Sequence, residues 1–400
     1  MRNGIRAAIS AFALLALTGS GAIAAENCGG GFEQWLVRFK KDAAAAGISQ
    51  STINAALTGV KFEQSVVNRD RAQGVFSQTF LEFAGRMVAG YRLQQGAAEL
   101  KKNASTFARI EKEFGVPGPV IVAFWGLETD FGANIGDFPT LNALATLAFD
   151  CRRPEKFRPQ LLDALRIIEA GDLRADEMRG AWAGELGQLQ FMPTDYLRSG
   201  VDYDGDGRRN LLRSKPDALA SSGSLLAHHG WQRGEPWLQE VRVLGSLPWQ
   251  EAGLDIKHTR AEWARWGVTY VNGSPLPADK APATLLLPMG RKGPAFLAYR
   301  NFDVYLEWNQ SLVYATTAAY FATRLAGAPA VSKGSPVDSL TGAETKELQR
   351  ILTRMGFDVG KTDGIIGEKT RESVRAVQLK YGMPPDSYPT KELLARVRGG

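Results

Sequence analysis

Residues 121–132 have the sequence Ile121-Val122-Ala123-Phe124-Trp125-Gly126-Leu127-Glu128-Thr129-Asp130-Phe131-Gly132, in which seven apolar or small residues lead directly to Glu128. A carboxyl group held against apolar side chains is harder to ionise, so its pKa rises. Such a group can act as a general acid near neutral pH. The spacing fits equally well with a helix whose last turn exposes Glu128 to solvent. Asp130 would point to another face of the helix, which makes it a poor second carboxylate for a two-carboxylate glycosidase.

The composition is that of a folded protein with two or three domains. The chain has 400 residues, of which 44% are hydrophobic and 22% charged. Two cysteines and three histidines exclude a disulfide-dense scaffold, a four-thiolate zinc module and most histidine-rich metal sites. The formal net charge of +6 is small, so no nucleic acid is expected as a partner.

The pattern of apolar residues predicts a mainly α protein. Helical spacing recurs in residues 32–39, 107–114, 161–168 and 312–325, and Gly115 and Gly171 end two of these runs. Strand patterns are confined to residues 284–287 and 295–299. The chain has no strand–helix alternation and no glycine-rich phosphate fingerprint, which argues against a Rossmann or P-loop enzyme.

Residues 1–24 are typical of a secretory signal peptide. Arg2 and Arg6 precede a largely apolar run over residues 7–17, and Ala22-Ile23-Ala24 forms a small-x-small cleavage site. No other stretch is apolar enough to span a membrane, and Cys28 lacks the small apolar residues of a lipid-attachment site, so no membrane anchor is expected. In an oxidising compartment, Cys28 and Cys151 are expected to form a disulfide. Two free buried thiols are the alternative.

Residues 326–336 have the composition of a linker, with small residues, Pro and Gly but no large apolar side chains. We therefore expect a body over residues 25–327, a linker over 328–336 and a C-terminal domain over 337–400. Periodicity in the last of these predicts a small helical bundle with a turn at Asp363-Gly364.

Two further segments of the body carry chemistry. Residues 182–193 combine glycines with Gln190, which suits a polar, uncharged substrate such as a sugar, although tight helix packing explains the glycines equally well. Residues 202–208 read Asp202-Tyr203-Asp204-Gly205-Asp206-Gly207-Arg208 and match the opening of a calcium loop. The usual glutamate at position twelve is replaced by Arg213, and the next carboxylate is Asp217. A solvated Asp-Gly turn is the alternative.

Five motifs in fixed order make the body resemble the membrane-bound lytic murein transglycosylase B family, including its soluble secreted members. The motifs are Gly126-Leu127-Glu128-Thr129, Cys151-Arg152-Arg153, Gln190-Phe191-Met192-Pro193, the aspartate loop that begins at Asp202, and His229-Gly230-Trp231. The resemblance covers about residues 30–325. It implies a lysozyme-like α+β catalytic body that cleaves peptidoglycan without a cofactor.

The resemblance also implies roles for individual residues. Glu128 would be the single catalytic acid and base. The glycan groove would be lined by Arg152, Arg153, Gln190, Tyr299 and Asn301. A structural calcium ion would be bound by Asp202, Asp204, Asp206, the carbonyl of Arg208 and Asp217. The chain departs from the family pattern at Ala181, Glu185-Leu186 and Leu225, which bears on fine contacts with the glycan.

The C-terminal domain resembles the small peptidoglycan-binding domain of bacterial wall enzymes, on the residues Leu348-Gln349, Gly356-Phe357, Asp363-Gly364-Ile365-Ile366-Gly367, Thr370 and Val374. A helical appendage for dimerisation is the alternative. Together the two resemblances imply a periplasmic lytic transglycosylase that acts on glycan strands, cleaves the MurNAc–GlcNAc bond and forms 1,6-anhydro-MurNAc. A hydrolytic muramidase and a non-catalytic scaffold are the rival functions. The sequence specifies no protein partner.

Overall fold

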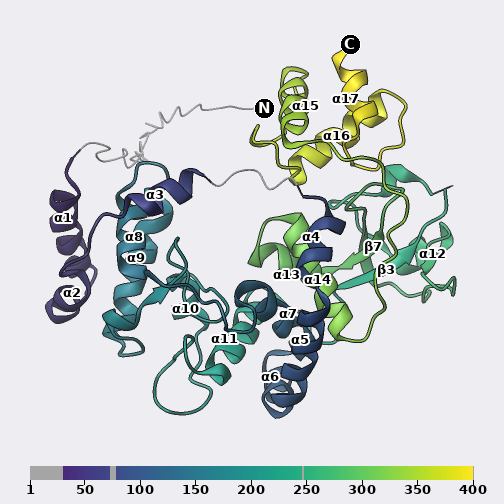
Figure 1. Cartoon of the computed structure of the whole chain (residues 1–400). Coiled ribbons are helices and arrows are strands. Elements are labelled where there is room, and N and C mark those ends of the chain that lie inside the picture. The colour runs from purple at the N-terminus through teal and green to yellow at the C-terminus, as the bar shows by residue number, and fades with distance from the viewer. Residues whose placement is uncertain (1–29, 73–77, 246, 400) are drawn as a thin grey trace, which may run out of the picture.

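The computed structural model of the chain describes residues 30–72, 78–245 and 247–399. This part of the chain is mostly helical (Figure 1), which confirms the predicted mainly α class. The expected signal peptide over residues 1–24 and the expected disulfide partner Cys28 lie outside the described residues. None of the described helices has the length and apolar character needed to cross a membrane.

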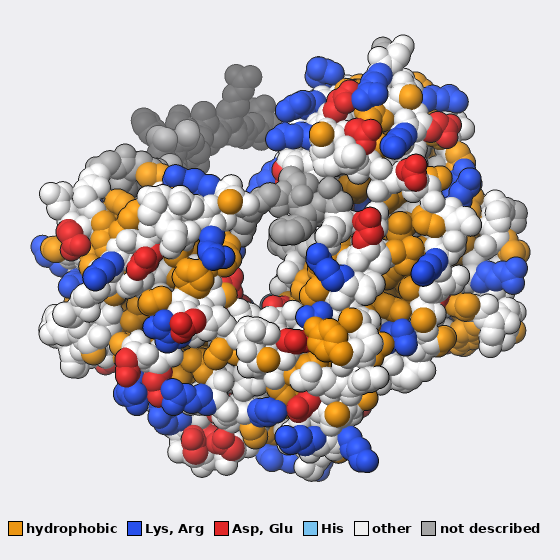
Figure 2. All heavy atoms as spheres, in the orientation of Figure 1, with side chains coloured by type: hydrophobic (Ala, Val, Ile, Leu, Met, Phe, Trp, Pro, Cys, Tyr) orange, Lys and Arg blue, Asp and Glu red, His pale blue; other side chains and the backbone are white. Residues whose placement is uncertain are grey.

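Helices form the first part of the body. They are α1 (Phe32–Ala45), α2 (Gln50–Leu57), α3 (Gln64–Arg71), α4 (Phe80–Met87), α5 (Gly90–Lys102), α6 (Ala104–Phe114), α7 (Gly118–Thr129), α8 (Thr140–Phe149), α9 (Pro154–Glu169), α10 (Pro193–Ser199) and α11 (Lys215–His228). Two short strands lie between these helices in the sequence and pair in antiparallel fashion: β1 (Phe138–Pro139) and β2 (Arg179–Gly180). Figure 2 shows a deep hollow between the side of the molecule that carries α8 and α9 and the side that carries α4 and the sheet described below.

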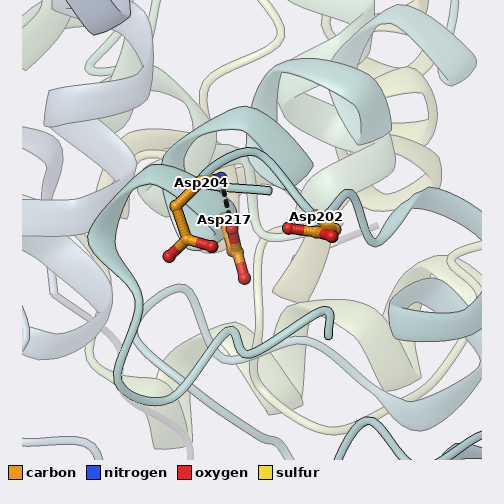
Figure 3. Close-up of side chains that lie close together, drawn as sticks. All are labelled: Asp202, Asp204 and Asp217. Carbon is orange, nitrogen blue, oxygen red and sulfur yellow. Dashed lines mark hydrogen bonds between the residues drawn. The ribbon is translucent and has the colours of Figure 1, made fainter. Parts of the chain in front are cut away.

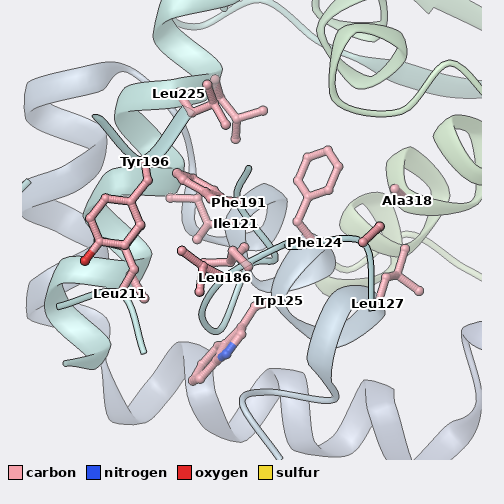
Figure 4. Packing of buried hydrophobic residues seen from close by; sticks show 14 of the residues in the cluster. Ile121, Phe124, Trp125, Leu127, Leu186, Phe191, Tyr196, Leu211, Leu225 and Ala318 are labelled. Atoms are coloured by element: carbon pink, nitrogen blue, oxygen red, sulfur yellow. The ribbon is translucent and has the colours of Figure 1, made fainter. Parts of the chain in front are cut away.

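Helix α7 lies at the centre of the main core. It is apolar around its whole circumference, and it packs against α5, α6, α11 and α14 (Leu312–Leu325). Figure 4 shows its side chains Phe124, Trp125 and Leu127 among residues of neighbouring segments, including Leu225 of α11 and Ala318 of α14. Gly126 permits a close approach of other side chains to α7, because a Cβ atom there would lie 2.8 Å from Phe131 and 2.9 Å from Phe321.

A five-stranded antiparallel sheet follows in the chain, with the order β4-β6-β7-β3-β5. Its strands are β3 (Leu238–Arg242), β4 (His258–Thr259), β5 (Thr269–Tyr270), β6 (Pro282–Leu286) and β7 (Ala295–Tyr299), with α12 (Arg260–Arg265) between β4 and β5. Every residue of β7 is buried. Phe296 and Ala298 belong to the main core, whereas Ala295, Leu297 and Tyr299 belong to a second core on the other face. Strand β7 leads directly into α13 (Arg300–Trp308), which precedes α14.

The C-terminal part consists of α15 (Gly342–Arg354), α16 (Glu368–Lys380) and α17 (Lys391–Arg398) around a core of their own. Residues 328–338 between it and the body form neither helix nor strand. The two parts are in contact. The buried guanidinium of Arg371 donates hydrogen bonds to the backbone carbonyls of Leu287 (3.2 Å) and Pro288 (2.9 Å), and Tyr388 is part of the main core.

Candidate active site

Glu128 stands in the last turn of α7, where the apolar helix meets the partly exposed surface. The helix ends because Asp130 and Phe131 adopt left-handed conformations, with φ of 54° and 62°. The Asp130 carboxylate turns to α5, where it accepts a hydrogen bond from Nε of Arg92 at 2.9 Å. Asp130 is therefore engaged on another face of the helix, as its spacing from Glu128 predicts.

Two aromatic side chains donate hydrogen bonds to the same oxygen of Glu128. The indole Nε1 of Trp308 lies 2.9 Å from Oε1, and the hydroxyl of Tyr314 also donates to Oε1. Trp308 is held in place by stacking on Phe124, with ring centroids 4.2 Å apart, and by edge contact with Phe191 at 5.7 Å. Because Oε1 already accepts two hydrogen bonds, an acidic proton on this carboxyl belongs on Oε2.

The surroundings raise the pKa of Glu128. Burial is the largest cause, since it disfavours the anion, and the nearby Glu185 carboxyl adds to it. The hydrogen bonds from Tyr314 and Trp308 act in the opposite direction because they stabilise the anion, but the pKa stays above its usual 4.5. The structure thus favours an enclosed acid at Glu128 over a solvated carboxylate at a helix end.

The glycine-rich segment over residues 180–191 packs against the end of α7. The hydroxyl of Thr129 donates to the carbonyl of Gln188 at 2.6 Å, and Leu186 and Phe191 pair through reciprocal backbone hydrogen bonds. Gln190 has a positive φ of 53°, and its amide nitrogen donates to the carbonyls of Gly187 (2.9 Å) and Ile135 (3.2 Å). These bonds fix the Gln190 side chain beside the site.

Arg152 and Arg153 follow Cys151 and converge on the buried carboxylate of Asp70, at the end of α3. Nη1 of Arg152 lies 2.5 Å from Oδ2 of Asp70, and Arg153 pairs with Oδ1. The side chain of Arg153 is 27% exposed and that of Arg152 43% exposed. Both arginines therefore link α3 to the start of α9, and the exposed parts of their side chains remain accessible to a ligand.

The structure corrects the prediction, made from the family resemblance, that Tyr299 and Asn301 line the groove. Tyr299 is 3% exposed, belongs to the second core of the sheet and donates from its hydroxyl to Gln239 at 2.6 Å. Asn301 is fully buried, and its amide bonds the backbone of Gln232 and Glu235. Neither side chain presents a surface to a glycan, because Tyr299 bonds a neighbouring strand of the sheet and Asn301 bonds the segment that follows α11.

Three residues of the site escape the sequence reasoning: Trp308, Tyr314 and Glu185. In the sequence, Trp308 and Tyr314 could have been found as two aromatic residues on either side of the short turn between α13 and α14. Ser311 in this turn caps α14 by accepting a hydrogen bond from the backbone nitrogen of Tyr314. Glu185 is visible in the sequence as a departure from the family pattern. Only the fold shows that its charge contributes to the raised pKa of Glu128.

The aspartate loop brings three of its expected ligands together. Carboxylate oxygens of Asp202, Asp204 and Asp217 lie within 4.8 Å of one another (Figure 3). Asp206 is not part of this group, and its Oδ1 accepts instead from the backbone of Arg208 at 2.8 Å. The Arg208 side chain turns away to Glu177, at 3.2 Å. Of the expected set, the structure therefore brings three carboxylates together and leaves Asp206 apart from them, whereas the backbone carbonyl of Arg208 stays a predicted ligand.

Asp217 organises this loop. It is fully buried at the start of α11 and accepts hydrogen bonds from the backbone nitrogens of Tyr203 (2.8 Å), Asp204 (3.3 Å) and Asn210 (2.8 Å). Three carboxylates this close repel one another unless a cation lies between them. Their hard oxygen atoms fit calcium, and no histidine or cysteine stands within residues 202–217 to favour zinc.

Comparisons with known proteins agree with this geometry. A family model described as the Transglycosylase SLT domain matches residues 31–323, and a model for a peptidoglycan binding domain matches residues 341–397. Membrane-bound lytic murein transglycosylase B of Escherichia coli K12 is 30% identical over 241 residues, which span 59% of this chain and 64% of that relative.

Solved structures show the same fold. SltB3 of Pseudomonas aeruginosa, in complex with NAG-anhNAM-pentapeptide, is 40% identical, with a TM-score of 0.87 over 92% of this chain and 100% of that chain. The Escherichia coli lytic transglycosylase Slt35, in complex with calcium, is 26% identical, with a TM-score of 0.62 over 73% of this chain and 92% of that chain. These likenesses confirm the lysozyme-like body with a C-terminal helical domain. The chain belongs to the family of the Transglycosylase SLT domain and carries a peptidoglycan binding domain at its C-terminal end.

Proposed function

We propose that the chain is a lytic murein transglycosylase that cleaves the MurNAc–GlcNAc bond of peptidoglycan and forms 1,6-anhydro-MurNAc. The observation that carries the proposal is the environment of Glu128, a carboxyl group enclosed by apolar side chains with two hydrogen-bond donors on one oxygen. Such a group can give up a proton and then be stable as the anion that takes one back. Glycan strands are the proposed partner.

Glu128 would serve both steps of the reaction. It first donates the proton on Oε2 to the bridging oxygen, and the acetamido carbonyl of MurNAc attacks C1 as the C1–O bond breaks. The Trp308 and Tyr314 hydrogen bonds to Oε1 then stabilise the carboxylate. Next, the C6 hydroxyl attacks C1, the acetamido group leaves, and Oε2 takes the hydroxyl proton. The catalytic carboxyl returns to its starting state, and no water is consumed.

Similar proteins support this assignment. Lytic transglycosylases are among the relatives, and SltB3 is described with an anhydro-sugar ligand and with NAG-NAM-pentapeptide. We assign the catalytic domain to residues 25–327, the linker to 328–336 and the peptidoglycan-binding domain to 337–400. Arg152, Arg153 and Gln190 are the proposed groove residues.

Export and calcium complete the proposal. We propose a signal peptide over residues 1–24, a periplasmic location, and a disulfide between Cys28 and Cys151.

Asp202, Asp204 and Asp217 would bind a calcium ion that stabilises the loop and takes no part in the chemistry. The calcium complex of Slt35 supports this assignment.

The test is digestion of purified sacculi, with the released fragments analysed by mass spectrometry. The wild type is expected to release anhydro-muropeptides, and Glu128→Gln is expected to release none while still binding sacculi. Glu111→Gln, an exposed carboxylate on α6, serves as the matched control and should cleave normally. Reducing-end products would identify a hydrolytic muramidase, and cleavage by Glu128→Gln would remove Glu128 from the mechanism.

A further inference from the structure

A cavity between the body and the C-terminal part adjoins the segment that carries Trp308. It has a volume of about 530 Å³ and is lined by Glu307 and Gln310 on one side and by residues from 359–370 on the other. Trp308, which donates to Glu128, stands between Glu307 and Gln310 in the chain. Cavities that bind small ligands commonly measure about 300–1,000 Å³. The proposed mechanism gives this one no role.

Contacts between the two parts hold both walls of the cavity in place. Arg371 of α16 donates to the carbonyls of Leu287 and Pro288, and Arg375 of the same helix donates to the carbonyl of Gln250. In Figure 1, α13 lies at the edge of the hollow and the C-terminal helices lie above it. The cavity is therefore part of the folded arrangement, with one wall from each part of the chain.

The loop that forms the C-terminal wall has a fixed backbone. The buried side chain of Gln349 accepts a hydrogen bond from the nitrogen of Gly364 (2.8 Å) and donates one to the carbonyl of Ile365 (2.9 Å). Gly364 has a φ of 86°, and a Cβ atom there would lie 2.6 Å from the carbonyl oxygen of Gly342. The side chain of Ile365 nevertheless stays 48% exposed in the cavity wall. A ligand can bury this surface without first having to order the loop.

Three charged side chains of the cavity are available to a ligand. Lys361, Glu307 and Glu368 are exposed, and none of them forms an ion pair within the described part of the chain. Lys369, by contrast, pairs with Asp358 at 2.6 Å. The cavity thus offers an ammonium group, two carboxylates and an apolar surface. A short peptide with a free carboxyl end has the matching groups, namely a carboxylate, amide N–H donors and apolar side chains.

We propose that this cavity, which we call the stem site, binds the peptide stem of a MurNAc residue held at the catalytic site. The inference rests on the proposed function and specifies which part of the substrate the C-terminal domain recognises there. The ammonium group of Lys361 binds the terminal carboxylate of the stem, and Glu307 accepts from an amide N–H. Ile365 packs against an apolar side chain of the stem.

The length of a stem fits the position of the stem site. The SltB3 ligands carry pentapeptides, and five residues in extended conformation span about 17 Å. Gln310 in the cavity wall is two residues from Trp308, so their Cα atoms are at most about 7.6 Å apart. A stem on a sugar beside Glu128 can therefore reach the cavity while the sugar stays in place.

The test compares two synthetic oligosaccharides of equal length, one with pentapeptide stems and one without stems. Lys361→Met should raise KM for the stem-bearing substrate roughly 2–5-fold, the range of an exposed ion pair. Ile365→Ser should raise it roughly 3–10-fold through lost apolar contact. Since the stem lies away from the reacting bond, kcat should not change. KM for the stem-free substrate should stay at the wild-type value in both variants.

The two substrates distinguish a peptide site from a sugar site. A rise in KM that is confined to the stem-bearing substrate supports the proposal. An equal rise for both substrates would identify a subsite for sugar and would overturn it. Unchanged KM for the stem-bearing substrate in the double variant Lys361→Met/Ile365→Ser would overturn it as well.

Matched controls come from exposed residues outside the cavity. Lys346→Met on α15 and Leu379→Ser on α16 should leave KM unchanged for both substrates. The melting temperature of each variant is measured, and if Ile365→Ser does not fold, the substrate dependence of Lys361→Met decides. Reducing-end products from the wild type would contradict the proposed function, whereas anhydro products without a stem-dependent change in KM would contradict only this inference.

Discussion

The hydroxyl of Tyr314 donates a hydrogen bond to Oε1 of Glu128, a residue 186 positions earlier in the chain. The contact is possible because α14, which begins at Leu312, packs along α7. Burial and the nearby Glu128 together raise the pKa of Tyr314 well above its usual range, so the hydroxyl keeps its proton and acts as a permanent donor.

Tyr314→Phe should therefore impair the proposed acid. Loss of this donor raises the pKa of Glu128 further and leaves its anion less stable, so kcat should fall by roughly 10–100-fold. The alkaline limb of the activity profile should move to higher pH. Tyr305→Phe on α13 is the control: its buried hydroxyl has no partner among the described residues, so kcat and stability should not fall. A normal kcat in Tyr314→Phe would contradict the assigned hydrogen bond.

Glu128→Gln should raise the stability of the protein at neutral pH. The folded state raises the pKa of Glu128 above 4.5, so the stability from its protonated form is present below pH 4.5 and is lost as pH rises through the folded-state pKa. Gln does not titrate. The melting temperature of Glu128→Gln should exceed that of the wild type at pH 7, and the difference should shrink towards pH 4.5. A constant difference across this range would rule out the raised pKa.

Calcium should stabilise the protein, and this effect should require Asp204 but not Asp206. An ion bound only by the folded state adds about 2.7 kcal/mol at a hundredfold excess over its Kd. Chelation should lower the melting temperature of the wild type and of Asp206→Ala, and Asp204→Ala should no longer respond. Magnesium should restore the chelated protein poorly, because it loses its water ligands reluctantly. Identical melting with calcium and with chelator would exclude the ion.

Arg371→Met should loosen the C-terminal part from the body. The substitution keeps most of the side-chain volume but leaves the carbonyls of Leu287 and Pro288 without their donor, at a cost of roughly 1–3 kcal/mol. Limited proteolysis should then cut residues 326–336 faster than in the wild type. The exposed Arg354→Met serves as the matched control. Equal cleavage rates in all three proteins would show that Arg371 does not hold the parts together.

The proposed disulfide between Cys28 and Cys151 should protect both thiols from alkylation. Protein purified from an oxidising compartment without reductant should take up no alkylating reagent until it is reduced. Such bonds typically contribute about 2–4 kcal/mol, so Cys151→Ser should lower the melting temperature. Two thiols that react in the unreduced, unfolded protein would disprove the bond.

Segments whose own pattern determines their structure were predictable from the sequence. The helix expected at Leu312–Leu325 and the strand at Ala295–Tyr299 are found with those bounds, and the strand expected at 284–287 is β6, Pro282–Leu286. An apolar run between Pro, Gly or capping residues carries this information locally. For Glu128, the same apolar run left two interpretations open, and the burial of its carboxyl group favours the enclosed one.

Contacts between distant segments were not predictable. The donors Trp308 and Tyr314 reach Glu128 only because α13 and α14 fold back onto α7, and no local pattern encodes that approach. The prediction for Asn301 was wrong for a related reason. The family resemblance placed Asn301 and Tyr299 in the groove, but the fold turns both side chains inward. Tyr299 of β7 donates to Gln239 of β3, and Asn301 of α13 donates to the backbone of Gln232 and Glu235.

The confinement of α7 has a mechanical consequence. With neighbours on every side and Gly126 pressed between Phe131 and Phe321, the helix has no free volume in which to rotate or slide. The position of Glu128 in the molecule is therefore fixed. If Glu128 is the proton donor, as proposed, any ångström-scale adjustment between its carboxyl group and the glycosidic bond has to come from the sugar or from Trp308 and Tyr314, and the glycan strand has to move relative to a fixed group.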